Sequence, residues 1–325
     1  MNPAVAAVRN AVKDFFERNP LPEGSLFLTA VSGGADSLAL AAACVFVAKK
    51  LKLRVGGVVI DHGLQAGSEK IAEAAAEKLR VLGLEPVIVR RVKVGKSGGP
   101  EAAARDARYA ELRSVAAELE AAMVFTGHTR SDQAETVLLS LARGSGSGSL
   151  RGMNDFDSGF GRPLLSISRE QTIAAAQALG LDPWNDPHNS DESFTRVRVR
   201  KNLLPLLERE LGPGVEQSLV RTAELVRDDD EALDALAAGM ARQLLITEPT
   251  VALPVDGIEN RPRALRTRII RIAAKTAGFG ALTLAHSWAI DELVRNWHGQ
   301  AAISVPGGSV VRRDKLILFR ATSEG

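Results

Sequence analysis

The first half of the chain alternates short apolar runs with longer helical stretches, and this alternation restricts the fold more than any other feature. The expected strands are Leu26–Val31, Val55–Ile60, Pro86–Val92 and Met123–Thr126, and the expected helices are Asp36–Lys50, Glu69–Leu82, Glu101–Leu119 and Asp132–Ala142. Strands separated by helices of this length form a parallel sheet covered on both faces. We therefore predict an α/β fold with a doubly wound parallel sheet, in which ligands bind at the carboxyl ends of the strands.

Beyond Leu165 the alternation ends and helical periodicity dominates. The expected elements there are helices at Arg169–Leu179, at Leu203 to about Leu245 and near Pro262–Ala277, followed by a terminal β-hairpin over residues 302–311 and 315–320. A length of 325 residues, at about 150 residues per domain, also indicates two domains. We place the boundary after Gly212-Pro213-Gly214. This gives an N-terminal domain of residues 1–215 and a smaller, mainly helical domain of residues 216–325 that ends in the hairpin.

Composition excludes several classes of protein. Hydrophobic residues make up 45% and charged residues 25% of the chain, as in ordinary globular proteins. The longest apolar run, Leu38–Ala48, has 11 residues, whereas a membrane span needs roughly 20. A single cysteine, Cys44, can form neither an internal disulfide nor a Cys-based zinc site. Because no apolar stretch follows the basic N-terminus either, we expect a cytoplasmic protein without a membrane partner.

The net charge of +2 does not itself indicate a nucleic-acid partner, but the basic residues are unevenly distributed. Between Arg261 and Ile290 there are six Lys or Arg residues and no Asp or Glu. At 100° per residue, Arg268, Arg271 and Lys275 lie within about 60° of arc on the expected helix. Such a stripe can contact phosphates, although a solvated helix face has the same pattern.

The segment Ser32-Gly33-Gly34-Ala35-Asp36-Ser37 joins the first expected strand to the first expected helix. A strand-to-helix turn directs free backbone N–H groups and the positive end of the helix at one point, which favours anion binding. The two glycines permit a close approach of phosphate oxygens, and Ser32 and Ser37 add hydroxyl donors. Asp36 would repel a bare phosphate, so its presence indicates a magnesium ion between carboxylate and phosphate. The alternative is ordinary helix-start chemistry.

Two better-known nucleotide motifs fail. Gly95-Lys96-Ser97 resembles the end of a Walker A loop, but Arg90 occupies the position of its first glycine. Gly144-Ser145-Gly146 begins a dinucleotide-binding pattern, but Ser149 replaces a required glycine and the segment follows a helix. We expect both glycine-rich segments, 95–100 and 144–148, to be surface loops near a ligand.

The Ser32–Ser37 loop resembles the pyrophosphate loop (PP-loop) of the N-type ATP pyrophosphatases, whose fold is adenine nucleotide α-hydrolase-like. Within that superfamily the chain is most similar to the tRNA(Ile)-lysidine synthetases. The segments that carry this resemblance are Asp61–Gln65, Glu101–Arg105 with Arg108-Tyr109, Gly127-His128 with Asp132–Thr136, Arg143–Gly146, Arg162–Leu165, Trp184–Pro187 with Asn189, and Arg196–Arg198. Thr129 and Ser131 stand where many members carry a second histidine and a second carboxylate.

The resemblance implies a carbon–nitrogen ligase that joins L-lysine to C2 of the wobble cytidine in the isoleucine tRNA with a CAU anticodon. The cytidine is first adenylated, and AMP and pyrophosphate are released. The implied ATP-binding residues are Ser32, Gly33, Gly34, Ala35, Asp36 and Ser37, with Mg²⁺ on Asp36, and the implied catalytic residues are Asp36, Arg105, His128 and Asp132. Arg105 is the candidate for the α-phosphate; a surface pair with Glu101 is its alternative role.

Lysine must lose a proton to react, since at a pKa of about 10.4 only about one amine in a few thousand is neutral at pH 7. Asp132 is the expected partner, with Glu135 on the same helical face. Alternatively, Thr129 and Asp132 form only a capping box, and His128 is structural. The tRNA-binding candidates are Arg196, Arg198, Arg200, Lys201, Arg268, Arg271 and Lys275. A homodimer is compatible with the sequence.

Two other functions are compatible with parts of the sequence. The first is another PP-loop activity, tRNA thiolation or amide ligation. Thiolation uses a persulfide cysteine or an iron–sulfur cluster, for which Cys44 is poorly suited, and amide ligation usually needs a glutaminase with a catalytic cysteine. The second is a nucleotide- and tRNA-binding protein without chemistry, which would not need Arg105 and Asp132 to act together.

Overall fold

The computed structural model describes residues 2–63, 67–92, 100–144, 146–186 and 190–322. The chain forms two compact units, residues 1–143 with 152–223 and residues 144–151 with 224–325. The change from one unit to the other at residue 223 lies within α10 (Val215–Leu244), and the boundary expected near residue 215 coincides with the start of that helix.

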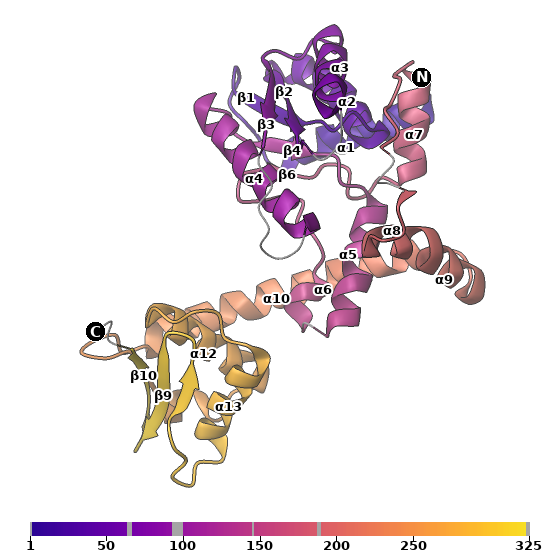
Figure 1. The fold of residues 1–325 in the computed structure, drawn as a ribbon. Coiled ribbons are helices and arrows are strands. Elements are labelled where there is room, and N and C mark those ends of the chain that lie inside the picture. Colours follow the sequence, from indigo (N-terminus) through magenta and orange to yellow (C-terminus); the bar gives the residue numbers. More distant parts are fainter. Residues whose placement is uncertain (1, 64–66, 93–99, 145, 187–189, 323–325) are drawn as a thin grey trace. The chain divides into compact units, whose positions relative to one another are not determined.

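The first unit contains a six-stranded sheet in the order β3-β2-β1-β4-β6-β5 (Figure 1). Its strands are β1 (Leu26–Ala30), β2 (Arg54–Asp61), β3 (Val87–Arg91), β4 (Val124–Thr126), β5 (Phe156–Asp157) and β6 (Phe160–Gly161). All neighbouring strands are parallel except β5 and β6, which form an antiparallel edge. The predicted doubly wound parallel sheet is therefore confirmed.

Helices precede and connect these strands, and further helices follow the sheet. They are α1 (Pro3–Arg18), α2 (Ala35–Leu51), α3 (Ser68–Leu82), α4 (Pro100–Glu118), α5 (Arg130–Arg143), α7 (Arg169–Ala178), α8 (Thr195–Arg198), a π-helical turn over Val199–Leu203, and α9 (Leu204–Leu211). Each strand and helix predicted between residues 26 and 143 is present, with bounds that differ by at most two residues. Helix α1 was not predicted, although Asn2 caps it and Pro3 occupies its first position.

The two faces of the sheet border two different apolar cores, and successive residues of β1 point alternately into one and the other. Phe27 packs among α1, α2 and α7, whereas Leu28 packs against Leu112 and Val115 of α4. Because side chains alternate along a strand, a strand buried on both faces is apolar at nearly every position. Thr29 is the polar exception in β1, and its hydroxyl donates to the Gly56 carbonyl at 3.1 Å. The five residues of β1 are all buried.

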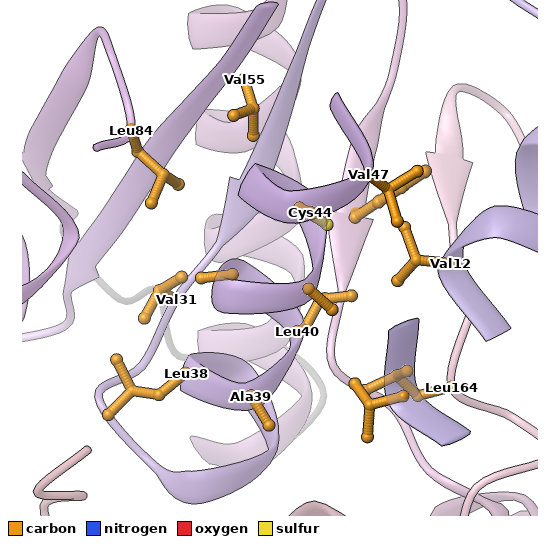
Figure 2. Packing of buried hydrophobic residues seen from close by; sticks show 14 of the residues in the cluster. Val12, Val31, Leu38, Ala39, Leu40, Cys44, Val47, Val55, Leu84 and Leu164 are labelled. Atoms are coloured by element: carbon orange, nitrogen blue, oxygen red, sulfur yellow. The ribbon is translucent and has the colours of Figure 1, made fainter. Parts of the chain in front are cut away.

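Helix α2 is the central helix of the larger core and is apolar nearly all round. Leu38, Leu40, Cys44 and Val47 project from it toward neighbouring elements (Figure 2). Cys44 is fully buried, and burial raises the pKa of its thiol well above the usual value. It therefore serves as a small core residue, as the sequence indicates.

The second unit combines helices with a four-stranded antiparallel sheet in the order β7-β10-β9-β8. Its elements are α6 (Ser147–Leu150), the C-terminal part of α10, β7 (Ala252–Pro254), α11 (Val255–Ile258), α12 (Arg263–Thr276), α13 (Leu284–Arg295), β8 (Ile303–Val305), β9 (Gly308–Arg313) and β10 (Leu316–Ala321). Buried residues of α12, α13 and the sheet, including Ile269, Ile290 and Phe319, share one core. The expected terminal hairpin is β9–β10, with Asp314 at positive φ in its turn.

The two glycine-rich segments, 95–100 and 144–148, are predicted to form surface loops, and the structure describes only the second in most of its length. Residues 93–99 lie outside the described part of the chain, and Pro100 begins α4. In the second segment the loop is short, because helix α6 begins at Ser147. Within the described residues, no helix has both the length and the apolar character needed to cross a bilayer.

Candidate active site

The candidate site lies where the strand order of the first unit reverses. The chain leaves β1 toward β2 and β3 and then returns to β4 on the other side of β1. At such a switch point the connections leave the sheet in opposite directions and open a crevice beyond the carboxyl ends of the strands. The loop Ser32–Gly34 follows β1 at this point, and Gly127-His128 follows β4.

The loop after β1 has the backbone expected of a phosphate cradle. Gly33 has φ +85°, a conformation that favours glycine, and its carbonyl accepts a hydrogen bond from Trp184 N at 3.0 Å. Gly34 is the N-cap of α2 and forms no side-chain cap. Ser37 Oγ donates to the Gly34 carbonyl at 2.9 Å and accepts from Ser32 N at 3.3 Å. The loop is thus closed by its own serine, while the first turn of α2 has no side-chain cap competing for an anion.

Gly127 allows the end of β4 to approach the first turn of α2. A Cβ at this position would lie 3.2 Å from backbone atoms of Asp36 and Ser37. Such a contact is too close for any larger residue without a backbone shift. The glycine therefore keeps the two carboxyl-end loops together.

A polar cavity of about 440 Å³ adjoins this loop. Its lining residues are Ala30, Ser32, Gly34, Ala35, Asp36, Ser37, Arg108, Gly127, His128, Asp132, Arg169, Ile173, Trp184, Asn185 and Arg200. A smaller, more apolar pocket of about 140 Å³ shares Ala30, Ser32, Arg108 and Trp184 with it and continues along β2 to Asp61, His62 and Ser68. The two cavities provide adjoining polar and apolar compartments at the switch point.

Arg169, the first residue of α7, links two carboxylates across the polar cavity. Its Nη1 lies 3.4 Å from Asp36 Oδ2, and its Nη2 lies 3.0 Å from Asp132 Oδ1. Its Nε is buried and has no hydrogen-bond partner among the described residues. Thr172, one turn further along α7, donates to Asp36 Oδ1. Burial raises the pKa of Asp36 above its ordinary value, although Arg169 and the Thr172 hydroxyl oppose this shift.

Asp132 both caps a helix and lines the cavity. Its Oδ2 accepts from Thr129 N at 2.8 Å and from Thr129 Oγ1 at 2.9 Å, while its Oδ1 lies near Arg169 and Arg200. Burial opposes ionisation, but Arg169, His128, the Thr129 N–H and Arg200 together hold the pKa of Asp132 below its ordinary value. The capping role therefore does not exclude a role in the cavity.

Arg200 lies in the π-helical turn and reaches into the same cluster. Its Nε donates to Glu135 Oε1 at 2.6 Å and its Nη2 to Glu135 Oε2 at 3.0 Å. Glu135 is fully buried and does not line the cavity. Burial raises the pKa of Glu135, against the effect of Arg200. Irregular helical turns often occur at functional sites, and this one brings a candidate tRNA-binding residue to the carboxylates.

His128 and Arg108 complete the cavity wall. His128 Nδ1 lies 2.8 Å from Thr126 Oγ1, and burial lowers the pKa of this imidazole to about 3. Burial also lowers the pKa of Arg108, but a guanidinium remains protonated at neutral pH. Arg108 forms no ion pair with a described residue, so its charge is available to an anionic ligand.

Other predicted residues lie outside the cavity. Arg105 is exposed and its guanidinium lies 4.9 Å from the Tyr109 ring centroid; the Glu101 side chain lies outside the described residues. Arg198 donates to the carbonyls of Glu192 and Ser193, and Lys201 donates to that of Ser190.

The remaining basic residues predicted to bind tRNA differ in their surroundings, and Thr129 and Ser131 replace residues typical of the family. Arg196 is half-buried, Arg268 pairs with Asp230 and Asp234, Arg271 donates to Ser287, and Lys275 is exposed. The replacements have hydrogen-bonding roles: Thr129 donates to Asp132, and Ser131 donates to Glu216.

Arg169, Thr172 and Arg108 are the site residues that sequence reasoning missed. Arg108-Tyr109 belongs to a segment that resembles the family, but the sequence assigns these residues no role. For Arg169 the sequence predicts only the start of a helix. Its signal was the sequence Ser168-Arg169-Glu170-Gln171, a capping box that fixes the first turn of α7, but the facing carboxylates are known only from the tertiary structure.

Comparison with known proteins agrees with this geometry. Residues 5–207 match the PP-loop domain family and residues 253–317 match the TilS substrate binding domain. The fold and the site thus define a PP-loop protein. The structure of the U34-tRNA thiolase NcsA from Methanococcus maripaludis with its [4Fe-4S] cluster superposes with a TM-score of 0.59 and 19% identity, covering 69% of this chain and 80% of that one; this likeness concerns the fold alone.

Two curated relatives cover nearly the whole chain. The tRNA(Ile)-lysidine synthase of Thermobifida fusca (strain YX) is 52% identical over 313 residues, which are 96% of this chain and 95% of the relative. That of Leifsonia xyli subsp. xyli (strain CTCB07) is 50% identical, covering 93% of this chain and 91% of the relative. The chain belongs to the tRNA(Ile)-lysidine synthase family. The predicted family, fold class and ligase class are confirmed.

Proposed function

We propose that this chain uses ATP to join L-lysine to C2 of the wobble cytidine in the CAU-anticodon isoleucine tRNA, releasing AMP and pyrophosphate. The observation that carries the proposal is the polar cavity at the switch point. There the N-terminus of α2 lies beside two guanidinium groups, those of Arg169 and of Arg108, and the latter forms no ion pair with a described residue. Membership of the synthase family supports the same reaction. A tRNA substrate is consistent with a reaction in the cytoplasm, which we propose as its location.

The two adjoining compartments suit the two ends of ATP. The apolar pocket along β2 is lined by Val58, Ile60 and Ile71 and accepts the adenine. The Ser32–Ser37 loop accepts the outer phosphates at the N-terminus of α2, where backbone N–H groups and the helix dipole favour an anion. Arg108 lines both compartments, so it is placed to neutralise the phosphate between them.

A divalent cation fits the polar cavity at Asp36. Mg²⁺ is usually held by one or two carboxylates together with substrate phosphates, and the Asp36 carboxylate lines the cavity next to the loop. Thr172 and Arg169 orient that carboxylate. When bound, Mg²⁺ neutralises charge on the departing pyrophosphate.

In the first step, the C2 oxygen of the cytidine attacks the α-phosphorus of ATP. An oxygen–phosphorus bond forms, the bond from the α-phosphorus to the bridging oxygen breaks, and pyrophosphate leaves. Arg108 can donate to oxygens that gain charge in this step, and the Arg169 guanidinium, which lines the same cavity, adds positive charge. We retain Arg105 as a second candidate for the α-phosphate, which would require its exposed side chain to turn toward the cavity. His128 is neutral and can donate or accept one hydrogen bond to the base or phosphate.

In the second step, the ε-amine of lysine attacks C2, a C2–N bond forms, and the C2–O bond breaks to release AMP. Asp132 is the carboxylate proposed to receive the ammonium and take up its proton, because its Oδ1 lies at the cavity. Glu135, proposed with it for lysine binding, contributes by holding Arg200 beside Asp132. The other proposed tRNA contacts are Arg196, Arg198, Lys201, Arg268, Arg271 and Lys275.

The experiment separates the two steps. The protein is incubated with α-labelled ATP and the CAU-anticodon isoleucine transcript, first without lysine and then with it. The proposal predicts label on the tRNA without lysine, and release of labelled AMP with incorporation of lysine on its addition. Formation of ADP, or lysine incorporation without AMP release, would refute the scheme. Asp36→Ala is the control and should show neither step.

A further inference from the structure

A separate cavity of about 830 Å³ lies within the C-terminal unit. Its lining residues are Gly146, Gly148, Ser149, Arg263, Ala264, Thr267, Arg268, Arg271, Leu282, Thr283, Leu284 and Trp288. They come from α12, from the start of α13 and from the segment around α6, and none of them is acidic. Arg268 and Arg271 are among the proposed tRNA contacts, but no chemical step takes place in this cavity.

Two arginines bring uncompensated charge to the cavity wall. Arg263, Thr267 and Arg271 are spaced by four residues and so lie on one face of α12. Two neighbouring arginines are already neutralised: Arg266 pairs with Asp291, and Arg268 pairs with aspartates of α10. By contrast, Arg263 and Arg271 are exposed and form no ion pair with any residue that the structure describes. Among the described residues, Arg271 has one neutral partner, the Ser287 hydroxyl, at 3.1 Å.

An aromatic side chain lies beside these charges. Trp288 of α13 is 47% exposed, and the Arg263 guanidinium lies 5.5 Å from its ring centroid. Unstacked nucleic-acid bases bind by stacking on aromatic rings and guanidinium planes, while cations beside the ring hold the backbone. We infer that this cavity holds an unpaired nucleotide of the RNA substrate, with its base on Trp288 and its phosphates at Arg263 and Arg271. The inference rests on the proposed function for the identity of the RNA.

The same unit contains a matched control. Trp297 is 40% exposed and Arg312 lies 4.9 Å from its ring centroid, yet neither lines the cavity. Trp297→Ala therefore removes an equally exposed tryptophan with an arginine partner, while leaving the cavity intact. Trp288→Phe keeps an aromatic face in the cavity, and Arg263→Gln keeps the tryptophan but removes one charge.

The test measures dissociation constants of the full chain for the isoleucine tRNA and for a blunt RNA duplex without unpaired nucleotides. Trp288→Ala should weaken tRNA binding about tenfold, as expected for loss of one stacked base, with unchanged duplex binding. Trp288→Phe and Trp297→Ala should bind tRNA like the parent chain, and Arg263→Gln should bind it more weakly. Thermal melting confirms that each variant is folded; if Trp288→Ala is not, Trp288→Phe and Arg263→Gln decide.

Two results would overturn the inference. The first is a dissociation constant for tRNA that is the same in the folded Trp288→Ala variant, or in Arg263→Gln, as in the parent chain. The second is an equal loss of tRNA binding and duplex binding in Trp288→Ala. This result would show that the cavity contacts only the backbone of double-helical RNA. Failure of the proposed function has a different signature: the parent chain would form no lysidine, although Trp288→Ala would still bind the tRNA more weakly.

Discussion

Arg169 Nη2 lies 3.0 Å from Asp132 Oδ1, and the same guanidinium also reaches Asp36. One side chain of α7 therefore holds the carboxylate proposed for the metal and the carboxylate proposed for lysine. Removal of one partner from a buried ion pair costs about 3–5 kcal/mol because the remaining charge is uncompensated. We predict that Arg169→Met lowers the melting temperature and reduces tRNA adenylation at least about a hundredfold.

The control is Arg209→Met, which removes an exposed arginine of α9 and should alter neither quantity. Arg169→Lys keeps the charge but cannot reach both carboxylates in the same way, so it should retain stability better than activity. Adenylation by Arg169→Met at the parent rate would show that the bridge has no part in the first step.

Gly127→Ala is expected to damage ATP binding by displacing the phosphate loop. The added Cβ would lie 3.2 Å from the backbone of Asp36 and Ser37 and would push the phosphate loop away from β4. We predict weaker ATP binding by calorimetry and a lower melting temperature. Gly239→Ala is the opposite control: this glycine lies within α10 with no close neighbour, so alanine should stabilise the helix by about 0.5–1 kcal/mol. An unaffected ATP affinity in Gly127→Ala would contradict the close-approach argument.

His128 is expected to stay neutral under all working conditions. Burial lowers the pKa of its imidazole from 6.5 to about 3, so folding favours the neutral form. The resulting contribution to stability is fully present above about pH 6.5 and is lost as the pH falls toward 3. When the pH is lowered from about 7 to about 4.5, the melting temperature of His128→Asn should therefore fall less than that of the parent chain. Nitrogen chemical shifts that show a protonated His128 at about pH 6 would contradict this assignment.

Asp132→Asn should separate the two chemical steps. The amide oxygen can still accept from Thr129 and cap α5, but the negative charge proposed to receive the lysine ammonium is lost. Lysine incorporation should fall by about 10²–10⁴, the usual contribution of a general base, whereas pyrophosphate release with tRNA should change much less. Thr129→Val, which removes one hydrogen bond to Asp132, should affect both steps mildly. Equal losses in both steps of Asp132→Asn would assign the residue a structural role.

The sequence predicts the parallel sheet and the phosphate loop because both depend on local patterns. Buried strands such as β1 are apolar at nearly every position, Thr29 being the exception in β1, and a glycine-rich turn before α2 favours anion binding. The sequence also predicts that α12 is basic, but it does not show which of its arginines are free of an acidic partner and can bind an anion. Arg266 and Arg268 are neutralised by Asp291, Asp230 and Asp234, residues more than twenty positions away, and only the folded unit shows those pairs.

The same limit explains the cavity residues. Glu135 shares a helical face with Asp132, which suggested a shared ligand, yet it is buried against Arg200. In the sequence Arg200 is one member of a basic run, whereas in the structure the π-helical turn directs it to the carboxylates. These assignments depend on how α5, α7 and the Val199–Leu203 turn pack together, which no local pattern specifies.

The most direct test of the central claim follows the oxygen at C2 of the wobble cytidine. If ATP activates this atom, the oxygen must leave with the α-phosphorus when lysine displaces it. A transcript carrying ¹⁸O at that position is converted with unlabelled ATP and lysine, and the products are weighed by mass spectrometry. The account predicts one ¹⁸O atom in the released AMP and none in the lysidine base. Unlabelled AMP, with the isotope in water or retained in the tRNA, would contradict it.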